Sequence, residues 1–442
     1  STPSSEQFRF KQFIDKAIGY GIKGRQVDGN NVLDVYKAVS EIAASIRESP
    51  RPYILECMTF RMRGHEEASG TKYIPQELFE EWGKKDPLKN YQEFLVQEGL
   101  INEEIISELR EGIRTEIESS LEKAFAADLP VPDPEREERE MYDTRPAEMI
   151  KPASPEGSEK RFVNAVSDAL RQAMKRHPDL VIMGQDIAEY GGVFKVTEGF
   201  VDEFGRSRVR NTPLCESAII GTALGLSIQG IKSVVEMQFA DFVSCGFNQI
   251  VNNLAKTHYR WGQNADVVVR MPTGAGVGAG PFHSQSNEAW FFHTPGLKIV
   301  YPAFPDDAKG LLAAAIEDPN PVLVFEHKAL YRSVTGFVNN DYYTTPIGKA
   351  RVIREGSDLT IVTYGFGVHW AMEALDEMSD ISADLIDLRS LMPWDKECVL
   401  ESVKNTGKVI VLHEDTLTGG IGAEIASTIA ENCFMDLDAP VT

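Results

Sequence analysis

Short runs of apolar residues recur along the chain, and segments with helical spacing of apolar residues lie between them. From residue 161 onward, apolar runs at 180–183, 233–237, 267–270 and 322–325 predict buried strands. Segments such as 161–176, 217–229 and 242–257 have patterns compatible with helices. Strands that alternate with helices predict a mostly parallel sheet that is covered on both faces.

Two further regions of mixed pattern flank this one. Near the C-terminus, apolar runs at 358–362 and 408–412 predict a second parallel α/β layer. Near the N-terminus, residues 6–125 predict mixed α/β structure, with a strand at 53–57 and a helical pattern over 91–124. Between them, residues 127–160 are rich in Pro, Glu, Asp and Arg, which predicts an extended linker.

The patterns therefore divide the chain into parts of the α/β class. We expect one module over residues 1–125, a linker over 126–160, a second module over 161–340 and a third over 341–442. A chain of 442 residues is too long for one hydrophobic core, so several domains are expected on length alone.

Composition and charge exclude several classes of function. Apolar residues make up 42% of the chain and no run approaches the length of a membrane span, so no membrane association is expected. A net charge of -22 repels phosphate backbones and argues against nucleic acid as a partner. The five cysteines are widely spaced, which fits reduced thiols in a cytoplasmic protein and argues against a zinc site. The start lacks both Met and a signal peptide pattern, which indicates a fragment or a trimmed chain.

Four of the histidines differ in their settings. His283 follows a glycine-rich segment that would let the backbone approach a ligand closely, although a flexible surface loop is equally compatible. His65 lies in a polar loop after a predicted strand, where either a functional loop or a solvated charge run is expected. His258 and His327 stand near charged residues and are expected on the surface.

Glu216 stands at the start of a small apolar helix. One interpretation is an acidic residue that complements the helix dipole. The other is a partly buried carboxylate that is suited to proton exchange. The segment 28–31 reads Asp-Gly-Asn-Asn. Its residues are too close together in the sequence to surround a metal ion, so the segment predicts a turn.

Taken in order, several motifs of the chain resemble the E1 component of 2-oxo acid dehydrogenases. Residues 1–125 are similar to the second part of its α subunit, and residues 161–442 are similar to its β subunit. The motifs that carry the resemblance lie at 19–24, 27–31, the His65 loop and 86–88, and then at 191–194, 211–221, 236–241, 274–286, 306–312, 387–395 and 413–415.

The resemblance implies thiamine diphosphate-binding modules with parallel sheets and a transketolase C-terminal-like domain, with the α and β subunits fused. A homodimer of fused chains would then be equivalent to an α2β2 assembly. It also implies that the thiamine diphosphate site uses Mg²⁺ whose ligands precede Ser1, and that the C-terminal domain is truncated. We therefore expect this chain alone to bind the cofactor poorly.

Roles for individual residues follow from the same resemblance. Glu216 matches the carboxylate that bonds the cofactor's aminopyrimidine, and His65 and His283 match the active-site histidines, which assist acyl transfer to a lipoyl group on the E2 acyltransferase. The other positions that match the cofactor pocket are Leu214, Gln238 and Phe242, the last where Tyr is often found.

Two smaller features of the resemblance concern ions and regulation. Asp318 and Asn320 fall where some relatives bind a monovalent cation. Glu66 replaces a Ser that is phosphorylated in some relatives, which argues against control by a kinase at that position.

The activity implied is oxidative decarboxylation of a 2-oxo acid. Segments 211–216, 283–288 and 325–328 are more similar to branched-chain members, which act on 2-oxoisovalerate, than to pyruvate enzymes. Pyruvate and acetoin dehydrogenases are alternatives within the family. A sugar-phosphate enzyme of the transketolase type would need a basic cluster that the sequence lacks. A non-catalytic subunit that binds E2 is the alternative that the missing metal motif supports.

Overall fold

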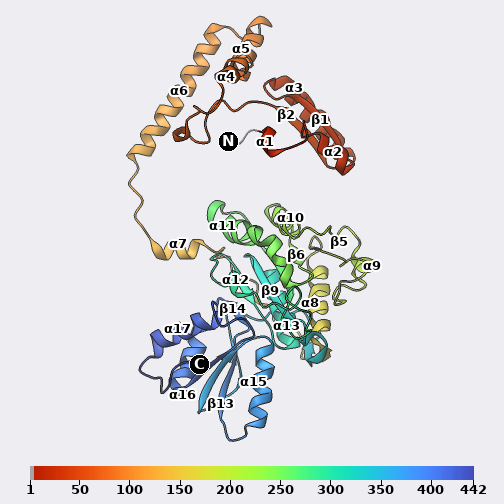
Figure 1. The fold of residues 1–442 in the computed structure, drawn as a ribbon, viewed down its shortest axis with the longest axis vertical. Coiled ribbons are helices and arrows are strands. Elements are labelled where there is room, and N and C mark those ends of the chain that lie inside the picture. Colours follow the sequence, from red (N-terminus) through yellow and green to blue (C-terminus); the bar gives the residue numbers. More distant parts are fainter. Residues whose placement is uncertain (1–3) are drawn as a thin grey trace. The chain divides into compact units, whose positions relative to one another are not determined.

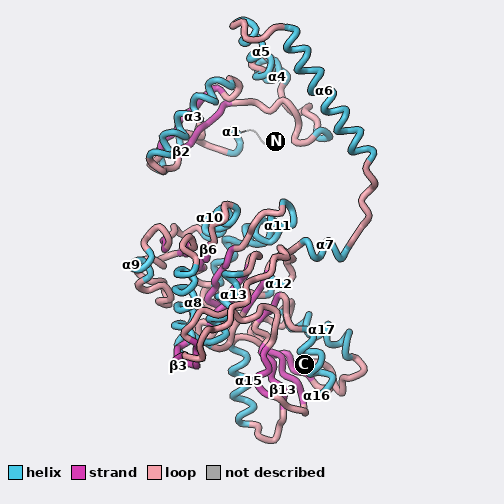
Figure 2. Tube along the Cα trace, turned by 180° about the vertical axis from the view of Figure 1, so that it is seen from behind, coloured by secondary structure: helices cyan, strands magenta, loops and turns pink. Residues whose placement is uncertain are grey.

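A computed structural model describes residues 4–442 of the chain, which form two compact units. The first unit ends at Val131, and the second runs from Pro132 to Thr442 (Figures 1 and 2). Within the described part of the chain, no helix is long and apolar enough to cross a membrane.

The first unit is built around two parallel strands, β1 (Lys23–Asp28) and β2 (Tyr53–Met58), joined by helix α3 (Val32–Glu48). The side chain of Asn31 caps α3 by accepting hydrogen bonds from two backbone amides, so the segment at 28–31 is the predicted turn. The other elements are α1 (Ser4–Gln7), α2 (Asp15–Tyr20), η1 (Glu67–Ser69), α4 (Gln76–Gly83), α5 (Pro87–Gln97) and α6 (Glu103–Ala126).

The helical pattern predicted over 91–124 is interrupted in the structure. Gly99 has a φ of 67°, a left-handed conformation that ends α5, and the Asn102 side chain caps the start of α6. The predicted helical pattern is therefore divided between two helices, because one turn residue outweighs the apolar periodicity on either side of it.

The stretch expected to be a linker contains a short helix, α7 (Pro134–Glu140), and then lies against the second unit. Tyr142 donates to the Leu297 carbonyl at 3.3 Å, and the Ile150 amide donates to the Thr344 hydroxyl at 2.8 Å. The last part is strand β3 (Gly157–Arg161), which pairs antiparallel with β10 (Thr335–Asn339). Residues from Tyr142 onward are thus fixed by hydrogen bonds to the rest of the second unit.

A seven-stranded sheet forms the centre of the second unit, in the order β14-β8-β9-β7-β6-β4-β5. All neighbouring strands are parallel except β14 and β8, which confirms the predicted sheet type. The strands are β4 (Val181–Gly184), β5 (Val209–Asn211), β6 (Ser233–Glu236), β7 (Val267–Thr273), β8 (Lys298–Val300), β9 (Val322–His327) and β14 (Ser390–Met392).

Helices cover both faces of this sheet, as predicted (Figure 1). Alternate residues of the central strands point to opposite faces. One face packs against α8 (Phe162–Arg176) and α13 (Pro305–Glu317), and the other packs against α10 (Glu216–Ile228) and the π-helix η3 (Gln249–Leu254). The helix predicted over 242–257 is instead the 3-10 helix η2 (Ala240–Gly246), η3 and α11 (Ala255–Trp261).

The C-terminal part forms a second layer with a four-stranded sheet in the order β11-β13-β12-β15. Strand β12 (Leu359–Thr363) is parallel to both β13 (Ala383–Asp387) and β15 (Val409–Leu412), which confirms the predicted parallel layer, and β11 (Arg351–Arg354) is antiparallel. Its helices are α15 (Phe366–Glu377), α16 (Lys396–Thr406) and α17 (Ile421–Cys433). One continuous hydrophobic cluster joins this layer to the central sheet. The remaining helices are α9 (Phe200–Phe204), α12 (Ala289–Phe292) and α14 (Leu330–Ser333).

Candidate active site

The residues predicted to be functional in the second unit gather at one edge of the seven-stranded sheet. Gln185 follows β4, Glu216 follows β5, Gln238 follows β6, and the loop that carries His283 follows β7. Since these strands are parallel, their carboxyl ends meet at the same edge, which is the usual position of ligand sites in such sheets.

Glu216 is half-buried at the first position of α10. The Gln185 side chain, which is 5% exposed, donates a hydrogen bond from Nε2 to Glu216 Oε1 at 2.8 Å. Within residues 4–442, the second carboxylate oxygen, Oε2, accepts no hydrogen bond from a neighbouring group. One oxygen is thus fixed and the other is free to bind a ligand, while the position at the helix start also favours the negative charge.

An aromatic platform of Phe239 and Phe242 supports His283. The imidazole packs edge-on against both rings, with centroid separations of 4.8 Å to Phe239 and 5.4 Å to Phe242. His283 and Phe242 are both half-buried, so the ring is held in place while part of it stays accessible. The structure therefore brings together these two predicted site residues.

The loop that carries His283 is anchored at both ends. The Gly274 amide donates to the Gln285 carbonyl at 3.1 Å, and the Gln285 amide donates to Asp241 Oδ1 at 3.0 Å. Gly274 has a φ of 93°, and a Cβ atom there would lie 2.0 Å from His327 Nε2. Glycine is therefore required where the backbone crosses His327, and the loop is a constrained one.

Leu214 and Gln238 lie at the same edge of the sheet but form fewer contacts with the other site residues. The Leu214 side chain is 83% exposed, and Gln238 Nε2 lies 3.5 Å from Asp186 Oδ2, a distance at the limit of a hydrogen bond. In the described part of the chain, neither side chain forms a hydrogen bond with Glu216 or His283. An exposed leucine beside a free carboxylate is a surface that a ligand could cover.

The other three histidines considered in the sequence analysis lie in different surroundings. His65 lies in the first unit, exposed in the loop after β2, where Arg61 donates to its carbonyl at 2.7 Å. His258 is half-buried. The prediction of a surface position for His327 was wrong, because the side chain is fully buried. Its Nε2 lies 2.6 Å from Glu414 Oε2, and a paired imidazole can be buried at low cost.

A buried ion-pair network lies among the strands that lead to the site. Arg270 on β7 donates to Glu236 Oε2 at 2.6 Å and to both oxygens of Glu326 at 2.8 and 2.7 Å. Burial alone would lower the pKa of Arg270, but the two carboxylates outweigh it and raise that pKa. Tyr331 adds a hydrogen bond to Glu326 at 2.7 Å. The network ties β6, β7 and β9 together just before the loops that carry the site residues.

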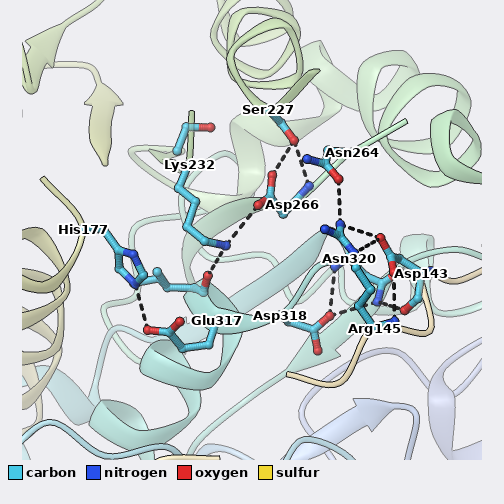
Figure 3. Close-up of polar contacts among 12 residues, drawn as sticks. Asp143, Arg145, His177, Ser227, Lys232, Asn264, Asp266, Glu317, Asp318 and Asn320 are labelled. Atoms are coloured by element: carbon cyan, nitrogen blue, oxygen red, sulfur yellow. Dashed lines mark hydrogen bonds and ion pairs between the residues drawn. The ribbon is translucent and has the colours of Figure 1, made fainter. Parts of the chain in front are cut away.

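Asp318 and Asn320 lie at the opposite edge of the sheet, before β9 begins. Asp318 accepts from the Lys298 ammonium at 2.6 Å, and Asn320 exchanges two hydrogen bonds with the backbone of Asp143. Figure 3 shows how Asn320, Asp318, Asp143 and Arg145 form one polar network. The positive charge beside Asp318 is thus the Lys298 ammonium, and both residues help to hold the segment after α7 on the second unit.

The residues at the candidate site fit one half of thiamine diphosphate. An aminopyrimidine ring has hydrogen-bond donors and acceptors along one edge, and the site offers the free oxygen of Glu216 and two buried polar atoms without partners, Gln185 Oε1 and Thr212 Oγ1. For the diphosphate half, the described residues provide no matching metal site. Over residues 4–442, no group of three or more His, Cys, Asp or Glu side chains is arranged to hold a metal ion.

Three residues at this edge were missed as site residues from the sequence: Gln185, Phe239 and Lys328. Gln185 stands two residues after a predicted strand, which was an available signal. The Phe239 contact to His283 and the burial of Lys328, which is 4% exposed, depend on segments far apart in the sequence. Burial lowers the pKa of the Lys328 ammonium to about 8 despite the nearby acidic residues.

Family models match three consecutive parts of the chain. The dehydrogenase E1 component model matches residues 1–134, the pyrimidine binding domain of transketolase matches residues 158–334, and the C-terminal domain of transketolase matches residues 348–442. The matches therefore cover both units.

Curated relatives and a solved structure each resemble about two thirds of the chain. The 2-oxoisovalerate dehydrogenase subunit beta of Bacillus subtilis is 47% identical over 284 residues, which span 63% of this chain and 87% of the relative. The mitochondrial subunit beta 2 of Arabidopsis thaliana is 46% identical over 298 residues, or 66% and 83% of the two chains. A solved structure described as a split gene transketolase, inactive beta4 tetramer, has a TM-score of 0.53 and 25% identity, with coverage of 64% and 86%.

Proposed function

We propose, since this chain belongs to the E1 family of 2-oxo acid dehydrogenases with an α-like part fused to a β-like part, that it decarboxylates branched-chain 2-oxo acids such as 2-oxoisovalerate. The chain is an E1 dehydrogenase, and its cofactor is thiamine diphosphate. The particular substrate, the use of Mg²⁺ and the transfer of the acyl group to a lipoyl group on E2 are parts of the proposal.

The observation that carries the proposal is the arrangement of the Glu216 carboxylate, with one oxygen held by Gln185 and the other free. When bound, thiamine diphosphate supplies a thiazolium ring that accepts the electrons released on decarboxylation. Glu216 would accept a hydrogen bond from a nitrogen of the aminopyrimidine ring through its free oxygen. It would thereby control the proton on that nitrogen. Gln185 would keep the carboxylate in the required orientation.

His283 is the residue that we assign to acyl transfer. Its ring is fixed by Phe239 and Phe242 but stays accessible, so it can donate or accept a proton at a reacting sulfur or oxygen. The apolar rings beside it would also limit the access of water. His65, on the first unit, is the second histidine that we assign to this step, and its assignment rests on the motif of its loop.

We expect 2-oxoisovalerate to be preferred over pyruvate and acetoin. The expectation rests on the similarity to subunits named for 2-oxoisovalerate. An apolar pocket separates substrates by about 1–3 kcal/mol per methylene, and 2-oxoisovalerate has two more carbons than pyruvate, so kcat/KM should favour 2-oxoisovalerate by ~30-fold or more. The test is to compare kcat/KM for the three substrates with an artificial electron acceptor. A higher value for pyruvate or acetoin would overturn the assignment of substrate and leave the cofactor chemistry in place.

We also propose that two fused chains pair, equivalent to an α2β2 assembly. Among the described residues of the first unit, the buried apolar side chains are only Ala17, Ala38 and Ile106. Helix α6 exposes apolar side chains at every fourth position, at Leu109, Ile113, Ile117, Leu121 and Phe125. Such a stripe is typical of a helix face that a partner covers. Light scattering should give the mass of two chains, and a stable monomer would contradict the proposal.

A further inference from the structure

The Glu414 carboxylate links the C-terminal layer to the loop that carries His283. Glu414 follows β15, and its side chain reaches two groups of the central sheet. Its Oε1 accepts a hydrogen bond from the backbone amide of Ala275, at the start of the His283 loop. Its Oε2 lies 2.6 Å from His327 Nε2, at the end of β9.

The hydrogen bonds around His327 show which ring nitrogen donates and which accepts. His327 Nδ1 accepts from the Ala329 amide at 3.3 Å, which places the proton of a neutral ring on Nε2. Nε2 then donates to Glu414, so both oxygens of the carboxylate act as acceptors. Burial would raise the pKa of Glu414, but the hydrogen bonds from His327 and Ala275 outweigh it and lower that pKa. The ionised carboxylate is therefore the form that holds the loop.

The packing around His327 leaves the loop little freedom. One face of the imidazole stacks on Phe366 of the C-terminal layer, with ring centroids 4.8 Å apart and an interplanar angle of 24°. The loop backbone covers the ring as well, since a Cβ atom at Gly276 would lie 3.2 Å from His327 Cε1. His327 is thus enclosed between the loop and the C-terminal layer, and Glu414 bonds to both the ring and the loop.

We propose that Glu414, together with His327, is a positioning residue that sets the His283 loop for acyl transfer. The proposal rests on the role proposed for His283. Glu414 itself would not touch the substrate. It would act by fixing the first residues of the loop, while Asp241 fixes Gln285 at the other end.

Glu414→Gln is the informative substitution because an amide has one acceptor oxygen in place of two. The variant must give up either the bond from Ala275 or the bond from His327, while its size is unchanged. Glu414→Asp keeps both acceptors on a shorter side chain and should recover part of the function. Glu431→Gln, which alters an exposed carboxylate on α17 of the same layer, is the matched control.

Three quantities would be measured on the holoenzyme: acyl transfer to a lipoylated E2 domain, decarboxylation with an artificial acceptor, and hydrogen–deuterium exchange over 274–286. For Glu414→Gln we expect transfer to fall ~10- to 100-fold, as for a misplaced catalytic group. Decarboxylation should fall far less, and exchange should rise in the loop but not in α16. The Glu431→Gln control should match the wild type in all three.

Two outcomes would overturn the proposal. One is unchanged transfer and unchanged loop exchange in Glu414→Gln. The other is an equal loss in both half-reactions, with faster exchange throughout the C-terminal layer, which would indicate a general structural role. His283→Asn separates this proposal from the proposed function. If that variant transfers acyl groups normally, the role of His283 fails, while loop exchange still tests whether Glu414 holds the loop.

If Glu414→Gln does not fold, the variant His327→Phe, alone and combined with Glu414→Asp, keeps the test decisive. His327→Phe retains a ring on Phe366 but removes the donor to Glu414. It should slow acyl transfer and loosen the loop in the same way. If the two residues act as one unit, the double variant His327→Phe/Glu414→Asp should lose no more acyl-transfer rate than the more damaging single variant. Additive losses in that rate would contradict the pairing.

Discussion

Replacing Glu216 with Gln is expected to lower decarboxylation by ~10²- to 10⁴-fold, the usual cost of losing a positioned acid or base. The amide can still accept the hydrogen bond from Gln185, so the side chain should stay in place. It cannot exchange a proton with the aminopyrimidine, which is the step assigned to this carboxylate. The measurement is the rate of CO₂ release from 2-oxoisovalerate by the holoenzyme, with circular dichroism to verify the fold.

Glu424→Gln is the control for this substitution. Glu424 is an exposed carboxylate in the first turn of α17, as Glu216 is in the first turn of α10. Both variants lose an acidic group that complements a helix dipole, so both should lose at most about 1 kcal/mol of stability. If Glu216→Gln keeps normal activity, or if both variants lose activity alike, the assignment of Glu216 is wrong.

Replacing Arg270 with Met is expected to lower the free energy of unfolding of the second unit by about 3–5 kcal/mol. The substitution leaves Glu236 and Glu326 buried without a counter-ion, and burial already raises the pKa of Glu236. The strands β6, β7 and β9 would lose the group that joins them beneath the site. Urea unfolding, followed by the circular dichroism of the second unit, measures the effect.

Arg332→Met is the matched control for the buried arginine. Arg332 is exposed on α14, and its replacement should change stability by less than about 0.5 kcal/mol. An unfolding midpoint for Arg270→Met equal to that of the control would show that the network contributes little. In that case, the backbone hydrogen bonds between the strands and the apolar packing are sufficient to hold the strand ends.

The local pattern of the sequence was sufficient to predict the central strands of the large sheet and the strands β12 and β15 of the C-terminal layer, but not edge strands such as β5 and β14. Apolar runs such as 267–270 and 322–325 became buried central strands, because a parallel sheet with two covered faces needs apolar side chains on both sides. The pattern was less reliable for helix ends. Gly99 divides the segment of helical pattern into two helices, and residues 242–257 contain 3-10, π and α turns.

The parts of the site that the sequence did not reveal depend on pairs of residues far apart in the chain. His327 was expected on the surface because its neighbours are charged, yet Glu414, 87 residues later, pairs with it in the interior. Arg270 stands in an apolar run, and nothing local indicates that Glu236 and Glu326 flank it. The structure places Glu216, Leu214, Gln238, Phe242 and His283 at one edge of the sheet, and their roles, like that of His65, remain predictions.

The most direct test of the proposed activity is the release of CO₂ from carboxyl-labelled 2-oxoisovalerate by the full-length holoenzyme in a single turnover without any lipoyl acceptor. The measurement isolates decarboxylation from acyl transfer and compares samples with and without thiamine diphosphate. We predict release in proportion to the number of active sites, dependent on the cofactor and strongly reduced in Glu216→Gln. No release, or release that does not depend on thiamine diphosphate, would contradict the proposed function.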